Sequence, residues 1–295
     1  MLSKADLTQG SITGTLLRFT LPMIIGSLLQ QCYNIADTLI VGQCIGSGAL
    51  AAVGSAYTLM VFLISILLGL SMGSGTVFSL QYGAGRMKAL RRSIYVSAVL
   101  IGTVTIVLNI AALSFIHPIL KLLQIPDDIY QMMYDYLWII FWGIGFTFIY
   151  NFYAALLRAI GNAVTPLYFL AISVVLNIGL DLFFILLLDW GIKGAAIATI
   201  IAQGVSALGI MGYTYAKCPE LRLHRNDLHF DRHCLKEITS FSTLTCIQQS
   251  VMNLGILMVQ GLVNSFGSMV MAAFAAAIKI DSFAYMPVQE FGNAF

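Results

Sequence analysis

Eight long apolar stretches dominate this sequence of 295 residues. Each has about 20 residues or more, which is enough for a helix to cross the hydrocarbon core of a bilayer. The stretches are 16–41, 50–80, 93–120, 134–157, 166–188, 194–215, 241–263 and 269–295. Only 9% of the residues are charged, against about 25% in soluble domains, so the chain cannot cover a water-soluble globule with polar side chains. The sequence therefore predicts an all-α polytopic membrane protein with eight transmembrane helices.

The overall charge and the cysteines exclude several other classes of protein. The formal net charge of +2 provides no basic field of the kind that nucleic-acid binders use. The five cysteines include no CxxC pair, so they predict neither a disulfide framework nor a tetrahedral zinc site. We expect no cofactor and no nucleic-acid partner.

Basic residues gather in alternate connections between the stretches. Twelve Lys and Arg residues share a side with the N-terminus, whereas only Lys121 and Lys193 lie on the other side. Because Lys and Arg accumulate in the short cytoplasmic loops of membrane proteins, we expect a multi-pass protein of the cell membrane with a cytoplasmic N-terminus. The opposite connections carry the acids Asp127, Asp128 and Asp189.

The longest polar segment, residues 216–239, predicts a cytoplasmic linker between two helical bundles. Residues 1–215 would form a six-helix bundle, and residues 240–295 the first two helices of a second one. The linker contains four side chains of types that bind metals, namely His224, His229, His233 and Cys234. Because no second ligand cluster accompanies them, we expect a solvated connector without a metal.

A shift of 221 residues aligns part of the chain with itself. The matched residues are Ile35, Gly46, Ser47, Ala51, Ala52, Ala56 and Phe62 with Ile256, Gly267, Ser268, Ala272, Ala273, Ala277 and Phe283. Internal repeats are common in transporter folds, where the substrate site lies between them. The second copy would hold only two of its six helices here. A complete protein would then have twelve, and this chain would be a fragment.

Polar residues in the first stretch lie on one helical face. Asp37 shares that face with Gln30, Tyr33 and Asn34, which precede it by seven, four and three residues. A charged side chain at mid-membrane costs about 2.5–3.5 kcal/mol on insertion scales, so this face should line protein or water. We take these amide and tyrosine side chains as substrate-cavity candidates, and Pro22 as a candidate hinge.

A second acid lies in the fifth stretch, where Asn177 and Asp181 are four residues apart. Thr199 and Gln203 repeat that spacing in the sixth stretch. If these faces converge with that of Asp37, they form an oxygen-rich pocket with two carboxyl groups. Such a pocket could bind a proton, or a hard cation such as sodium at Asp37 and Asp181. The alternative is that the two acids only hold helices together through hydrogen bonds.

The last two stretches carry further polar residues. Gln249, Asn253 and Gln260 form a neutral stripe in the seventh stretch, which could line a substrate cavity or mediate helix packing. Lys279 and Asp281 lie in the eighth stretch, two residues apart and therefore on different faces. We include all five among the substrate-cavity candidates.

Several short motifs resemble those of the multidrug and toxic compound extrusion (MATE) family. They are Leu21-Pro22 followed by Asp37 and Val41-Gly42, the segment Gln81 to Gly85, the segment Arg158 to Asn162 with Pro166, Asn177 to Asp181, and Lys279-Ile280 with Pro287 to Gly292. The resemblance covers the whole chain. It implies two six-helix bundles around a central cleft that export organic cations in exchange for sodium or protons.

The same resemblance implies roles for individual residues. Asp37, Asn177, Asp181 and Thr199 match the family's cation-coupling cluster in the first bundle, and Tyr136 would border it. Some members carry an acid in the seventh span, where this chain has only amides, so coupling would run through the first bundle alone. Family members are also longer than this chain.

We therefore expect a monomeric antiporter, not an enzyme, that exports organic cations, drugs or toxic compounds by alternating access. One alternative is a lipid-linked oligosaccharide flippase of the same superfamily, which would need more cleft cations than Lys279 provides. Another is a nonfunctional truncated fragment. An intramembrane aspartyl protease is disfavoured, because Ile-Gly-Leu precedes Asp181 where such enzymes need Gly-x-Gly.

Overall fold

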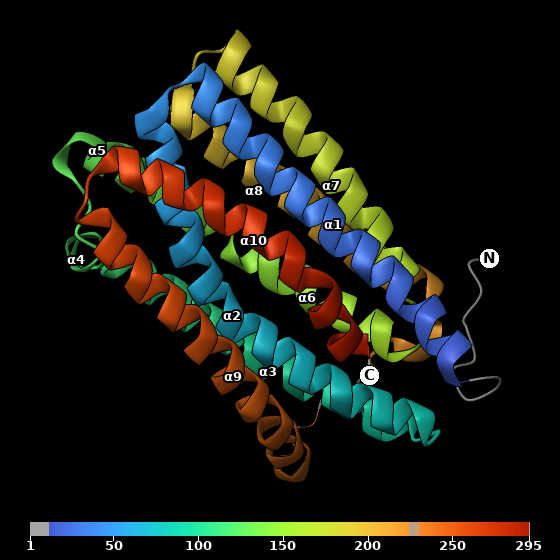
Figure 1. The fold of residues 1–295 in the computed structure, drawn as a ribbon. Helices are drawn as coiled ribbons and strands as arrows, with labels where there is room; N and C mark the ends of the chain where they lie inside the picture. Colours follow the sequence, from blue (N-terminus) through green and yellow to red (C-terminus); the bar gives the residue numbers. More distant parts are fainter. Residues whose placement is uncertain (1–11, 225–226, 228, 230, 295) are drawn as a thin grey trace.

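A computed structural model describes residues 12–224, 227, 229 and 231–294 of the chain, and the regular structure in this part is entirely helical (Figure 1). The elements are α1 (Ile12–Cys44), α2 (Ser47–Gly83), α3 (Met87–Ser114), α4 (Ile116–Leu122), α5 (Asp127–Trp142), α6 (Ile144–Ala159), α7 (Val164–Leu182) with a π-helical extension (Phe183–Leu187), α8 (Gly191–Lys217), a 3₁₀ turn (Pro219–Leu221), α9 (Arg232–Asn264) and α10 (Ser268–Ala294). The all-α prediction is confirmed.

The predicted apolar stretches lie in helices, although two of them are interrupted. Among the described residues, α2, α3, α8, α9 and α7 with its extension are each long and apolar enough to span a membrane. Helices α5 and α6 qualify together, as one span bent by 46°. The predicted stretch 93–120 breaks at Phe115, between α3 and α4. Pro118 has no N–H to continue α3, and it is tolerated in the first turn of α4.

Helix α2 lies at the centre of the fold and packs against α9, α6, α3 and α10, while α10 also packs against α1 (Figure 1). Two glycines allow the close approach of α2 to α9. A Cβ atom at Gly69 or Gly73 would lie less than 3.0 Å from the backbone of Cys246 or Ser242, respectively. Ser242 also donates a hydrogen bond to the Leu70 carbonyl at 3.2 Å.

Two turns that the proposed repeat aligns each contain a glycine with positive φ. Gly46 lies between α1 and α2 with φ of 125°, and Gly267, which is 221 residues later, lies between α9 and α10 with φ of 94°. These are left-handed backbone conformations that favour glycine. In both turns a serine is the first residue of the following helix.

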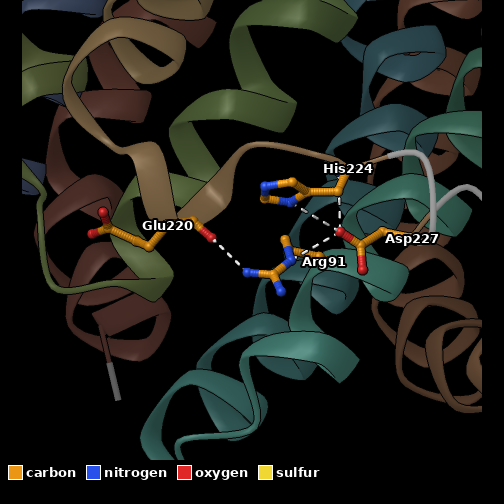
Figure 2. A network of polar contacts seen from close by, with 4 residues as sticks. All are labelled: Arg91, Glu220, His224 and Asp227. Atoms are coloured by element: carbon orange, nitrogen blue, oxygen red, sulfur yellow. Dashed lines mark hydrogen bonds and ion pairs between the residues drawn. The ribbon is translucent and has the colours of Figure 1, made fainter.

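The segment between α8 and α9 is anchored to the first turns of α3 (Figure 2). Arg91 Nε donates to Asp227 Oδ2 at 2.9 Å, and the same oxygen accepts from the backbone N–H of His224 at 3.1 Å. Arg91 also donates to the Glu220 carbonyl at 3.4 Å. Burial alone would raise the pKa of the Asp227 carboxyl group, but the His224 hydrogen bond and the Arg91 guanidinium outweigh burial and lower that pKa.

The four potential metal ligands of this segment do not converge. Cys234 lies 3.0 Å from Ser93 Oγ in the interface with α3, whereas His224 contacts Asp227. His229 and His233 are exposed. Within the described residues, no three His, Cys, Asp or Glu side chains gather closely enough to hold a metal ion.

Candidate ion and substrate site

Two acids from different helices lie together in the protein interior. The side chains of Asp37 in α1 and Asp181 in α7 are buried, with 6% and 0% of their surface exposed. Their carboxyl groups lie within hydrogen-bonding reach of each other. Two carboxylates can only accept hydrogen bonds, so a direct bond between them needs one proton. The predicted convergence of these two acids therefore occurs in the fold.

Asn177 and Thr199 join the two acids to α8. With its amide nitrogen facing Asp181, Asn177 donates to Oδ2 at 2.8 Å and accepts from the Thr199 backbone N–H at 3.3 Å. The Thr199 hydroxyl group lies 3.3 Å from the Tyr33 hydroxyl group of α1. Helices α1, α7 and α8 thus contribute to one polar cluster.

Tyr136 reaches the same cluster from α5. Its side chain is buried, and it interacts electrostatically with Asp37, Tyr33 and Asp181. The structure thereby brings together the five residues predicted for cation coupling, namely Asp37, Tyr136, Asn177, Asp181 and Thr199. This group is called the acid cluster below.

The acid cluster has the chemistry to hold a proton or a small hard cation. Its potential ligands are carboxyl, amide and hydroxyl oxygens, which suit sodium-like cations. Asp181 Oδ1 is buried and accepts no hydrogen bond within the described structure. A buried oxygen without a partner is costly, and a bound cation or proton would satisfy it.

A cavity of about 1150 Å³ opens beside the acid cluster. It lies between α1, α2, α6, α7, α8, α9 and α10. Most of the predicted cavity residues line it, namely Gln30, Tyr33, Asn34, Gln249, Asn253 and Asp281, and so does the candidate hinge Pro22. Its volume exceeds the range of about 300–1,000 Å³ that is typical of pockets for small molecules.

Two predicted cavity residues do not appear in the cavity lining. Gln260 lies elsewhere, and the side chain of Lys279 is not described. Gln260 is fully buried between α9 and α2, where it donates to Ser55 at 3.1 Å and to Asn264 at 2.8 Å and accepts from Thr58 at 3.2 Å. The packing role, one of the two considered for this stripe, fits its position. Lys279 lies in α10, and its side chain is outside the described part of the chain.

The cavity also includes polar residues that were not among the predicted cavity residues. Thr147 of α6 donates to Gln203 of α8 at 3.1 Å, and both residues line the cavity. Glu290 of α10 accepts a hydrogen bond from Ser27 of α1 at 2.7 Å. Arg158, which the charge count assigned to a cytoplasmic connection, also lines the cavity. Whether these residues reach the cavity depends on how distant helices pack, and spacing along one helix does not predict that packing.

Two residues connect the acid cluster to the cavity. Tyr33 and Thr199 line the cavity, and both also belong to the hydrogen-bonded surroundings of the two acids. A molecule in the cavity would therefore contact Tyr33, which interacts electrostatically with both acids, and Thr199, which bonds to Asn177 of the acid cluster.

The profile of the MatE family matches residues 22–183, which include α2 to α7 and most of α1. The chain belongs to the MATE family. It is 32% identical to the "Probable multidrug resistance protein YpnP" of Bacillus subtilis over 98% of this chain and 64% of that relative. It is 28% identical to the "Probable multidrug resistance protein NorM" of Thermotoga maritima over 92% of this chain and 59% of that relative.

A solved structure confirms the MATE fold. The outward-facing conformation of a multidrug resistance MATE family transporter of the MOP superfamily matches all of this chain with a TM-score of 0.88, at 23% identity. The match covers 65% of that protein. The chain is thus a multi-pass membrane protein that corresponds to about two thirds of a MATE transporter, and its relatives are transporters, not enzymes.

Proposed function

We propose that this chain is the ion-coupling and substrate-binding part of a MATE antiporter that exports organic cations in exchange for sodium or protons. Its relatives in Bacillus subtilis and Thermotoga maritima are named as probable multidrug resistance proteins. The observation that carries the proposal is the position of the buried Asp37 and Asp181 directly beside a large cavity.

The cavity walls suit an organic cation. Apolar residues such as Leu68, Met72 and Ile256 line much of the cavity, and the carboxyl groups of Asp281 and Glu290 provide negative charge. Aromatic and apolar walls with a few polar groups are typical of sites for drug-sized ligands. Methionine side chains adapt to ligands of different shape.

Coupling requires that the ion and the organic cation favour different conformations, because a ligand that binds both states equally shifts no equilibrium. In our proposal the ion binds the acid cluster, α1 changes its position with Pro22 as the hinge, and the organic cation is released outside. Asp37 is the link in this scheme, since it lies on the helix that also carries cavity residues Gln30 and Asn34.

The proposal is tested by ethidium efflux from cells that express the chain, energised by a sodium gradient or by a proton gradient. We expect Asp37→Asn and Asp181→Asn to lower the initial ion-driven rate at least about tenfold, which corresponds to about 1.4 kcal/mol of lost coupling. The gradient that supports efflux in the wild type identifies the ion.

Asp189→Asn is the matched control, because this acid lies in the turn before α8, outside the acid cluster and the cavity. It should leave efflux unchanged. Full ion-driven efflux in Asp37→Asn would remove this residue from the mechanism. A wild-type chain that exports no ethidium under either gradient would support the alternative of an inactive fragment.

A further inference from the structure

Four uncharged polar side chains are buried where α2 packs against α9. Ser55 and Thr58 belong to α2, Gln260 and Asn264 belong to α9, and each is at most 5% exposed. None of them belongs to the acid cluster. Apolar side chains of similar size would fill such an interface without hydrogen bonds that must be satisfied. The polarity of these four residues is therefore not explained by packing alone.

The four side chains form one hydrogen-bonded network with Gln260 at its centre. The Gln260 amide nitrogen donates to Ser55 Oγ at 3.1 Å and to Asn264 Oδ1 at 2.8 Å, and its oxygen accepts from Thr58 Oγ1 at 3.2 Å. Ser55 Oγ in turn donates to Asn264 Oδ1 at 3.2 Å. None of the four is among the described residues that have a buried polar atom without a partner. Gln260 thus bonds to all three other members.

The network lies at the end of the fold that the basic residues predict to be outside. Asn264 Nδ2 donates at 2.7 Å to the carbonyl group of Leu123, in the turn between α4 and α5, so the α9–α10 turn lies beside α4 and α5 (Figure 1). The network also adjoins the cavity. Thr58 lines it, and on α9 the lining ends at Val259, directly before Gln260. The network therefore joins α2 to α9 between the cavity and the outer turns.

The inner half of the same interface has a different character. At Gly69 and Gly73 of α2 the absence of a Cβ atom lets the backbone of α9 approach at Cys246 and Ser242. Such close packing loses its contacts outright when the helices separate. Hydrogen bonds between neutral side chains, in contrast, are exchanged for hydrogen bonds to water at a small net cost. The outer half of the interface is thus the part that separates more easily when water reaches it from the cavity.

We propose that Ser55, Thr58, Gln260 and Asn264 form an outer gate, which closes the cavity towards the outside between α2 and α9. The outer gate opens when water replaces the hydrogen bonds of Gln260, while the glycine contact of the inner half stays closed and serves as the pivot. This inference rests on the proposed function, because alternating access requires the outer side of the cavity to open and close.

Distances between pairs of nitroxide labels test the outer gate. The labels are attached to single cysteines in a variant without native cysteines, purified in lipid nanodiscs, and the distances are measured by double electron–electron resonance. The outer pair is Leu122→Cys with Phe266→Cys, at exposed positions next to the Leu123–Asn264 hydrogen bond. The inner pair is Leu80→Cys with Leu244→Cys, at exposed positions on the inner halves of α2 and α9. A longer distance in the outer pair indicates an open gate.

Gln260→Ala removes three hydrogen bonds and leaves their partners unpaired only while the gate is closed. We expect it to raise the ratio of the long to the short distance in the outer pair at least about tenfold, without a change in the inner pair. Gln248→Ala is the matched control, because Gln248 is an exposed residue of α9 outside the network and the cavity lining. It should leave both pairs unchanged.

A covalent link across the outer gate tests its role in transport. Ser55→Cys and Asn264→Cys together, joined by a short bis-methanethiosulfonate reagent, should stop ethidium efflux, because the gate can no longer open. A reducing agent cleaves the link and should restore efflux. The same reagent should leave efflux unchanged in each single cysteine variant.

The outcomes separate the inference from the proposed function. If Gln260→Ala changes the outer pair no more than Gln248→Ala does, or lengthens both pairs together, the outer gate is wrong. Continued efflux in the linked double variant would also overturn it. Ethidium efflux by the wild type would still support the proposed function in these cases. If the outer pair responds as expected but the wild type exports no ethidium, the gate stands and the proposed function fails.

Discussion

Asp227 and Asp231 lie four residues apart in the segment between α8 and α9, yet they differ in their surroundings. Asp227 is buried and pairs with Arg91 at 2.9 Å, while Asp231 lies 3.8 Å from Arg92 with both side chains more than a third exposed. Exposed ion pairs contribute about 0–1 kcal/mol, whereas hydrogen bonds to charged groups contribute about 1.5–3 kcal/mol. Asp227 should therefore hold this segment on α3.

We predict that Asp227→Asn lowers the opening free energy of residues 219–224 by about 1–2 kcal/mol at pH 7. The measurement is hydrogen exchange followed by mass spectrometry. Asp231→Asn is the matched control, and it should change this free energy by less than about 0.5 kcal/mol. Equal effects of the two variants would contradict the prediction.

The same ion pair sets a pH dependence. Because the folded protein lowers the pKa of Asp227 from its ordinary value of 3.8, its stabilising contribution is complete above that value. It is lost as the pH falls through the lowered pKa of the folded state. The difference between the wild type and Asp227→Asn should therefore shrink as the pH falls below about 4.

Residue spacing predicted the shared helical faces of the acid cluster, such as that of Asn177 and Asp181, whereas Tyr136 was expected only from the family resemblance. Spacing could not predict which residues on a polar helical face would reach the cavity. Gln249 and Gln260 belong to the same stripe of α9, but Gln249 lines the cavity and Gln260 bonds to α2. The charge count likewise assigned Arg158 to a cytoplasmic connection. Its position in the cavity lining depends on helices that are far away in the sequence.

At the scale of helices, hydropathy located the elements but not their breaks. The fourth apolar stretch contains no proline, and it nevertheless bends by 46° between Trp142 and Ile144. At the bend, the Phe141 carbonyl group accepts a hydrogen bond from the Asn109 side chain of α3. Breaks of this kind depend on a partner from another helix, so a window of hydropathy along one segment does not detect them.

Helices α2 and α9 approach each other very closely at Gly69 and Gly73 of α2. We predict that Gly73→Ala destabilises the protein by about 1–3 kcal/mol, because the new methyl group meets the Ser242 backbone and no flexible side chain can yield. Thermal unfolding in detergent measures the loss. Faster labelling of Cys246 by a maleimide would show that the helices have separated.

Gly255→Ala in α9 is the control for this substitution. A Cβ atom at that position meets nothing within 4 Å, and alanine favours the helix over glycine by up to about 1 kcal/mol. Its effect should be neutral or stabilising. If Gly73→Ala behaves like Gly255→Ala, the two helices are not held at the distance described here.

For the molecule as a whole, the alternation of basic residues predicts a cytoplasmic N-terminus. In a variant without native cysteines, single cysteines at Asp127 and Asp189 should react with an impermeant maleimide in intact cells. A cysteine at Lys88 should react only after the membrane is permeabilised. The two-bundle division at residues 216–239 and the monomeric state also remain predictions, and the reverse labelling pattern would overturn the orientation.

Tyr33 and Thr199 line the cavity and lie next to the two acids, so a ligand in the cavity and an ion at the acid cluster should affect each other's binding. If occupancy of one site changes the affinity of the other by some factor, the reverse effect must have the same factor, because binding free energies form a closed cycle. If a bound drug lowers the affinity of the protein for the ion tenfold, the bound ion lowers the affinity for the drug tenfold. The dissociation constant of a dye, titrated against sodium and against protons, would therefore reveal ion release without any direct detection of the ion.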